Sequence, residues 1–176
     1  RSIGINRLSI GLQAAQDRLL KRLGRIHCFQ DFQDTVLWAK EAGFENISAD
    51  IMFGLPDQSM SDWKETLTTV MESGVSHISA YGLKVEEDTA FDRMMVEGTL
   101  ILPEVEMERT MYHKACEIFE DKGFHQYEIS NFAKQKKESR HNLNYWECGD
   151  YLGIGLNSHS KLGDVRFWNY STFTEY

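Results

Sequence analysis

The apolar run Asn46-Ile47-Ser48-Ala49-Asp50-Ile51-Met52 has the length and composition of a buried β-strand. A helical pattern over residues 30–42 precedes it, and Gly43 marks the end of that helix. A second helical pattern follows it, introduced by Ser59 and Asp62 at the spacing of a capping box. A strand flanked by helices is the repeating unit of a sheet with parallel strands. The run therefore predicts an α/β fold.

Two further strands and a third helix extend this pattern in both directions. Residues 7–11 and 77–83 are short apolar or β-branched runs, and residues 107–119 have the period of an amphipathic helix. Residues 126–129 are a weaker candidate for a fourth strand. The repeated strand and helix units imply right-handed crossovers between parallel strands. They fit a barrel and an open doubly wound sheet equally well.

The last part of the chain has a different character. Residues 132–176 are rich in aromatic residues and glycine and show no clear period. We therefore predict two parts: 1–131, the later part of a barrel, and 132–176, the start of a C-terminal cap made of loops and short elements. Four strands are fewer than a barrel needs, and the first strand begins almost at once, so we expect further sequence upstream.

Composition and charge restrict the class of protein. The chain has 176 residues and a net charge of −8, so it has no basic field that would gather nucleic acid. No apolar run is long enough for a membrane span or a signal peptide, and we expect a cytoplasmic protein that is not an integral membrane protein. Cys28, Cys116 and Cys148 are far apart, which argues against a disulfide framework and a local metal cluster.

The polar residues at the carboxyl ends of the predicted strands are the first candidates for a site, because ligands of parallel α/β folds bind there. Gln13 offers an amide donor and acceptor to a ligand, although it fits a loop-capping role equally well. Asp50 interrupts an apolar strand, which favours a ligand site over a buried ion pair. Arg25 can supply a fork of donors to a carboxylate, and Lys84 follows the third strand.

Several segments together resemble the radical S-adenosylmethionine (SAM) proteins of the HemW and oxygen-independent coproporphyrinogen oxidase group. The segments are Asn6-Arg7-Leu8-Ser9-Ile10-Gly11-Leu12-Gln13, Leu23-Gly24-Arg25-Ile26-His27, Asp50-Ile51-Met52-Phe53-Gly54-Leu55-Pro56-Asp57-Gln58, Tyr127-Glu128-Ile129-Ser130-Asn131-Phe132-Ala133 and Ser139-Arg140-His141-Asn142-Leu143-Asn144-Tyr145-Trp146. The similarity keeps one order and spacing along residues 1–176. It implies a partial parallel (β/α) barrel of the radical SAM type.

The resemblance also implies cofactors. Proteins of this group bind a [4Fe–4S] cluster through a CxxxCxxC loop, and SAM at the cluster. This chain has no such loop, so no metal ligand is expected within it, the cluster cysteines are expected upstream, and the chain alone is expected to be inert. Gln13, Arg25 and Asp50 fall where the oxidases contact SAM through side chains. Lys84 and His159 fall where the contact is through the backbone, although His159 fits an ordinary loop histidine equally well.

Three functions are compatible with this resemblance. The first is a haem-binding chaperone, because His141-Asn142-Leu143-Asn144-Tyr145-Trp146 is typical of the HemW branch and is not expected in the oxidases. The second is an oxygen-independent coproporphyrinogen III oxidase, which removes propionate carboxylates oxidatively. The third, a barrel enzyme without a cluster, requires that the full gene lack CxxxCxxC. The chaperone interpretation leads, with SAM, haem or porphyrin, and a haem-acceptor protein as partners.

His141, Tyr145 and Trp146 are the candidate haem-binding residues. A neutral imidazole is a common axial ligand of haem iron, and aromatic rings offer the flat apolar surface that a porphyrin needs. On a helix, His141 and Tyr145 share one face. The alternative, that these side chains tie the cap region together through packing, remains open.

Overall fold

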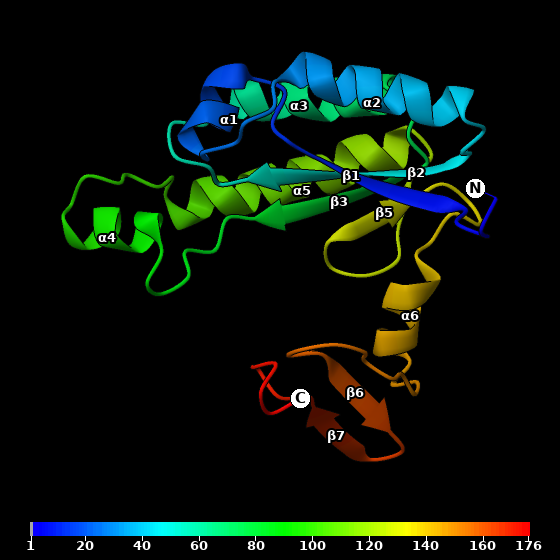
Figure 1. Ribbon diagram of the computed structural model, residues 1–176. Helices are drawn as coiled ribbons and strands as arrows, with labels where there is room; N and C mark the ends of the chain where they lie inside the picture. The colour runs from blue at the N-terminus through cyan, green and yellow to red at the C-terminus, as the bar shows by residue number, and fades with distance from the viewer. Residues whose placement is uncertain (1) are drawn as a thin grey trace. The chain divides into compact units, whose positions relative to one another are not determined.

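The computed structural model describes residues 2–176 and divides into two compact units, one ending at Lys137 and one covering Glu138–Tyr176 (Figure 1). The elements of the first unit are β1 (Arg7–Gln13), α1 (Asp17–Arg22), α2 (Phe29–Glu41), β2 (Asn46–Phe53), α3 (Met60–Glu72), β3 (His77–Gly82), α4 (Ala90–Val96), α5 (Val105–Asp121), β4 (His125–Gln126) and β5 (Asn131–Ala133). The elements of the second unit are α6 (Arg140–Trp146), β6 (His159–Leu162) and β7 (Val165–Trp168). None of the helices in residues 2–176 is long and apolar enough to cross a membrane.

The first unit contains a five-stranded sheet with the order β1-β2-β3-β5-β4. Strands β1, β2 and β3 are parallel and in continuous register, apart from a bulge where β1 ends. The predicted α/β class, with strands over 7–11, 46–52 and 77–83, is confirmed for these three strands. Strand β1 forms one edge of the sheet, because it pairs with β2 alone among the described residues.

The three predicted amphipathic helices are confirmed as α2, α3 and α5. The capping arrangement at the start of α3 is present in both directions. The Asp62 backbone N–H donates to Ser59 Oγ at 3.2 Å, and the Ser59 backbone N–H donates to Asp62 Oδ2 at 2.8 Å. The first N–H groups of a helix have no acceptor within the helix, and these two bonds satisfy two backbone N–H groups at its start. The capping box therefore fixes where α3 begins.

The prediction of a strand over residues 126–129 was wrong. The chain forms a small antiparallel hairpin there: β4 ends at Gln126, the first of those residues, and β5 begins at Asn131, after them. Glu128 closes the turn, because its carboxylate accepts from the Ser130 backbone N–H at 2.8 Å and from the Asn131 side chain. A turn held by its own side chains is favoured over a continued strand.

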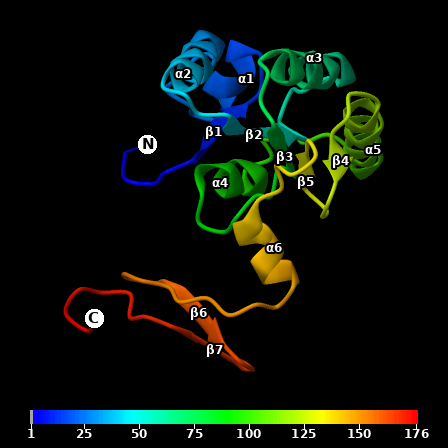
Figure 2. The same cartoon turned by 90° about the vertical axis from the view of Figure 1, so that its right-hand side faces the viewer.

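The sheet buries one face against helices. Figure 2 shows the strands nearly end-on, with α2, α3 and α5 around the outside of the curved sheet. The strand residues that pack against these helices are apolar and alternate along each strand; the fully buried ones are Leu12, Ile47, Ala49, Ile51, Ile78 and Ala80. The side chains between them point to the other face, as the two-residue period of a strand requires.

The second unit consists of one short helix and one hairpin. Ser139 caps α6, and its side chain accepts from the Asn142 backbone N–H at 3.4 Å. Strands β6 and β7 are antiparallel and place His159 opposite Trp168. Tyr151 adds an isolated bridge to Lys161. The second unit is therefore organised by backbone hydrogen bonds and short elements. It is not organised by a large apolar core.

Candidate functional site

The uncovered face of β1, β2 and β3 is almost entirely polar. Its side chains come from every second residue of the three strands: Arg7, Ser9, Asn46, Ser48, Asp50, Met52, His77, Ser79 and Tyr81. The three strands are parallel, so their carboxyl ends lie together at one end of the strands, toward α1 and α4 (Figure 1). Polar side chains on such a face are expected to bind a ligand or one another.

Gln13 bends back over the end of its own strand. Its φ of 64° and the bulge between Gly11 and Gln13 turn its amide toward Gly11. A Cβ on Gly11 would lie only 2.6 Å from Gln13 Nε2, so the glycine makes room for this amide. Because Gly11 is the register partner of Asp50, the amide lies on the polar face next to that carboxylate.

The Gln13 amide has an unused acceptor. The residue is only 8% exposed, and within residues 2–176 its Oε1 has no hydrogen-bond partner. A buried acceptor without a partner is costly and rare in folded proteins. Gln13 Oε1 is therefore suited to accept a hydrogen bond from a ligand hydroxyl or amine.

Asp50 supplies a second acceptor beside Gln13. The Ser9 hydroxyl lies 3.2 Å from Asp50 Oδ1 and 3.1 Å from Oδ2, and the carboxylate is half-buried. One hydroxyl donor leaves most of the lone pairs of a carboxylate available. Gln13 and Asp50 thus form a pair of acceptors that fits a ligand with neighbouring hydroxyl or amine groups.

A buried chain of hydrogen bonds lies on the same face, nearer the amino ends of the strands than Asp50. His77 is fully buried; its Nδ1 lies 2.7 Å from Ser48 Oγ, and its Nε2 lies 2.7 Å from the Tyr127 hydroxyl. Burial, and then the nearby Arg7 charge, lower the pKa of His77 to about 3. The imidazole is therefore neutral near pH 7, with one nitrogen donating and the other accepting.

The pKa of His77 predicts a pH-dependent stability. From pH 6.5 down to about 3 the unfolded chain protonates this imidazole and the folded protein does not. The unfolding free energy should therefore fall by about 1.4 kcal/mol per pH unit below pH 6.5 through this group alone. Urea unfolding between pH 6.5 and 5 measures the slope, where most carboxylates stay ionised. We expect His77→Gln to flatten it and exposed His113→Gln to preserve it; equal slopes in all three proteins would contradict the assignment.

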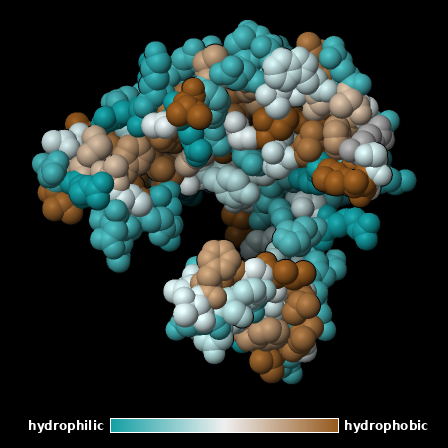
Figure 3. All heavy atoms as spheres, viewed as in Figure 1, coloured by the Kyte–Doolittle hydropathy of each residue, from teal (hydrophilic) through white to brown (hydrophobic). Residues whose placement is uncertain are grey.

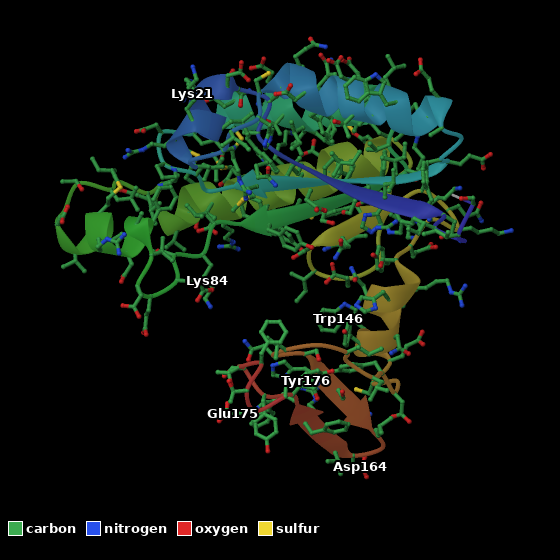
Figure 4. The ribbon with its side chains drawn as sticks, in the orientation of Figure 1. Lys21, Lys84, Trp146, Asp164, Glu175 and Tyr176 are labelled. Carbon is green, nitrogen blue, oxygen red and sulfur yellow. The ribbon has the colours of Figure 1, made fainter. Side chains whose placement is uncertain are left out.

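The other two candidates from the first unit, Arg25 and Lys84, also lie near the carboxyl ends of the strands, but they are exposed. Arg25 lies just after α1 and follows Gly24, which has a φ of 69°; the Arg25 backbone N–H donates to Leu20 O at 2.9 Å. Lys84 forms an ion pair with Glu86 at 2.9 Å and lines a cavity of about 390 Å³ between the end of α1 and the start of α4. Figure 4 shows Lys84 on the segment after β3. The structure thus brings Gln13 and Asp50 together and leaves Arg25 and Lys84 open to solvent.

The remaining candidates belong to the second unit. The helical geometry places the His141 ring edge-on to Tyr145, with ring centroids 4.7 Å apart, and Tyr145 in turn contacts Tyr151 at 4.5 Å. Trp146 is 60% exposed at the end of α6 (Figure 4). His159 is exposed on β6, and its ring centroid lies 5.9 Å from that of Trp168. Two histidines of this unit therefore each lie against an aromatic ring.

An apolar groove lies between helices of the first unit. Its volume is about 680 Å³, and Met60, Leu102 and Met107 contribute to its walls. Figure 3 shows apolar atoms, in tan and brown, where α4 and the start of α5 lie. The groove is lined by α3, α5 and the loops before them, so it is separate from the polar face of the strands.

No group of three or more His, Cys, Asp or Glu side chains within residues 2–176 is arranged to hold a metal ion. Cys28 and Cys116 are half-buried free thiols, and Cys148 is an exposed one.

Apart from Asp50, the polar strand residues of this face were not among the predicted site residues: Arg7, Ser9, Asn46, Ser48, His77 and Ser79. Tyr127, which contacts His77 from outside the three strands, was not predicted either. A signal for most of them was present in the sequence. Polar residues alternate with apolar ones along 7–11, 46–50 and 77–80, and this period places them on the face that carries Asp50. Tyr127 has no such signal, because it reaches His77 from a turn 50 residues away.

Comparison with known proteins identifies the wider group. Residues 1–70 match the profile of the Radical SAM superfamily. The chain is 42% identical, over its whole length, to 46% of the Bacillus subtilis heme chaperone HemW. It is 36% identical, over 90% of its length, to 41% of the Escherichia coli protein of the same name. The chain thus spans less than half the length of these relatives.

The fold agrees with these matches. The Escherichia coli coproporphyrinogen III oxidase HemN, a radical SAM enzyme, superimposes on the whole chain with a TM-score of 0.79 and 20% identity, over 43% of its own length. This likeness confirms the predicted fold, a parallel α/β arrangement of the radical SAM type, and the described strands form an open sheet. Residues 1–70 therefore match the radical SAM superfamily, and the whole chain has homologues among the heme chaperones HemW and the fold of a coproporphyrinogen oxidase.

Proposed function

We propose that this chain is the SAM-binding and haem-binding part of a HemW-like haem chaperone. The observation that carries the proposal is the 42% identity to a heme chaperone over the whole chain, including the segment from His141 to Trp146. In this proposal residues 1–131 are the later part of a radical SAM barrel and residues 132–176 begin a C-terminal cap. Haem passes to an acceptor protein in the cytoplasm.

SAM fits the acceptors on the polar face. In the proposal, Asp50 accepts from the ribose hydroxyls, and the unused Oε1 of Gln13 accepts from an amine or hydroxyl of the same ligand. Arg25, Lys84 and His159 complete the SAM contacts. Bound together, SAM and a [4Fe–4S] cluster supply reductive cleavage chemistry, and this chain's side chains hold SAM in the required geometry.

Haem fits the aromatic group on α6. His141 is exposed and offers an imidazole to the iron, while Tyr145 and Trp146 offer ring faces to the porphyrin. The oxidase function is the weaker candidate, because its support is a fold likeness at 20% identity.

A haem titration of the full-length gene product tests the chaperone proposal. We expect His141→Ala to weaken haem binding at least about tenfold and to shift the Soret band, because the iron loses its axial ligand. The matched control is His113→Ala, since His113 is also exposed and also edge-on to a tyrosine, with ring centroids 5.6 Å apart. An unchanged band and affinity in folded His141→Ala would remove His141 as a ligand. A parent that binds no haem would remove the chaperone function.

A further inference from the structure

Asn131 extends the polar face onto strand β5. This strand lies beside β3 and is antiparallel to it (Figure 2), with Asn131 directly opposite Ser79. Directly opposite residues of two paired strands point to the same face of a sheet. Ser79 belongs to the polar face, so Asn131 does too. The next residue, Phe132, points to the other face, where its ring packs against Phe119 with centroids 4.9 Å apart.

A single row of residues crosses the polar face at the level of Asp50. Gly11, which makes room for the Gln13 amide, is the register partner of Asp50. Asp50 is in turn the partner of Ser79, and Ser79 is the partner of Asn131. Neighbouring strands lie about 4.8 Å apart, so Asn131 lies about 10 Å from Asp50, on the side away from Gln13. The row therefore has a carboxylate inside it and an amide at each end.

The Asn131 amide has an unused acceptor. The residue is only 4% exposed, and within residues 2–176 its Oδ1 has no hydrogen-bond partner. Its Nδ2 donates to the Glu128 carboxylate. An ionised carboxylate only accepts hydrogen bonds, so the amide must keep its NH2 group toward Glu128 and its oxygen away from it. Turning the amide over therefore cannot satisfy Oδ1.

The position of this acceptor points to a ligand. Among the buried side-chain oxygens of the described residues, two lack a hydrogen-bond partner: Gln13 Oε1 and Asn131 Oδ1. Both amides lie in the row that contains Asp50. A buried acceptor without a donor is unfavourable, and two of them on either side of a carboxylate are explained together by one molecule that supplies donors to the whole row.

We propose that Asn131 Oδ1 accepts a hydrogen bond from an N–H group of the ligand that Asp50 and Gln13 hold. This inference rests on the proposed function, in which that ligand is SAM. SAM carries an amine on each side of its ribose, one on the adenine ring and one on the methionyl group. With the ribose hydroxyls at Asp50, the two ends of SAM extend to either side, and Asn131 takes the amine at the end that Gln13 does not.

The experiment measures binding of three probes to the reconstituted full-length gene product and to its Asn131→Leu variant by calorimetric titration. The probes are SAM, the inosine analogue of SAM, in which a carbonyl oxygen replaces the ring amine, and 5′-methylthioadenosine, which lacks the methionyl group. We expect Asn131→Leu to weaken SAM binding about tenfold, because a buried hydrogen bond is lost. The parent and the variant should bind equally the one probe that lacks the amine in question, which identifies that amine.

Two further variants separate binding from structure. The matched control is Asn46→Leu, because Asn46 lies on the same face nearer the amino ends of the strands and its amide oxygen already accepts from Arg7 at 3.0 Å. The double substitution Glu128→Gln, Asn131→Asp reverses the donor and acceptor of the pair but keeps an oxygen for the ligand. It should bind SAM at least as tightly as the parent. Urea unfolding checks that each variant folds.

Four results would overturn the inference. An equal loss for all three probes in folded Asn131→Leu assigns Asn131 to holding the hairpin turn. Equal losses in Asn131→Leu and Asn46→Leu indicate a general change in the sheet. Weakened SAM binding in the folded double variant, which also decides the matter if Asn131→Leu does not fold, means that the oxygen is not what binds. Unchanged SAM binding in Asn131→Leu leaves Oδ1 to an internal water and removes this inference alone, whereas a parent that binds no SAM removes the proposed SAM site with it.

Discussion

Asp50→Ala is expected to weaken SAM binding by about 1.5–3 kcal/mol, which is roughly ten- to hundredfold in affinity. The reason is that the ribose hydroxyls lose a charged acceptor that Ser9 leaves largely available. Calorimetric titration of SAM into the reconstituted full-length gene product measures the effect. The matched control is Asp34→Ala, a carboxylate on α2 that accepts from Gln30 at 2.8 Å away from the polar face.

A second variant separates direct binding from local structure. Ser9→Ala removes the hydroxyl that lies against Asp50 but keeps the carboxylate. We expect a much smaller loss of SAM affinity from this variant than from Asp50→Ala. Equal losses would mean that the pair matters for the shape of the sheet, and parent-like affinity in Asp50→Ala would exclude Asp50 from the SAM site.

Trp63→Ala is expected to lower the unfolding free energy by about 3–5 kcal/mol. Trp63 is fully buried between α3, α5 and the sheet, where its ring packs against Phe53 with centroids 5.5 Å apart. Its indole Nε1 also donates to Met111 O at 2.7 Å. Urea unfolding at pH 7 measures the loss, which combines a large cavity with a missing hydrogen bond.

Two comparisons test this explanation. Trp63→Phe keeps most of the volume and should cost about 1–2 kcal/mol. Trp38→Ala removes an indole that is 63% exposed on α2, and it should change the unfolding free energy by only about 0.5 kcal/mol. A similar loss for Trp38 and Trp63 would contradict the packing that the structure gives.

The elements that the sequence predicted correctly are those that bury a face. Strands β1, β2 and β3 appear in the sequence as short apolar or β-branched runs. Helices α2, α3 and α5 each bury a row of side chains against the sheet, and this burial gives the sequence the period of an amphipathic helix. Helix α4 buries no residue, and it was missed. Its only local signal is the Thr89 side chain, which accepts from the Asp92 backbone N–H at 3.2 Å.

The polar face was only partly predictable, for a similar reason. Gln13 was selected by its position just past a strand, and Asp50 was selected as a carboxylate inside an apolar strand. The space that Gly11 leaves for the Gln13 amide depends on a bulge and on the positive φ of Gln13. No residue pattern in the sequence predicts either feature. The Ser48, His77 and Tyr127 chain joins residues that are far apart in sequence, and such contacts exist only once the sheet has formed.

The two edges of the sheet differ in length, and this difference bears on how the chain behaves during preparation. Strand β1 offers an edge of 7 residues and β4 an edge of only 2. The backbone N–H and C=O groups along a long edge attract any extended peptide, including another copy of the same strand. For residues 2–176 taken alone, aggregation at high concentration is therefore expected to begin along β1.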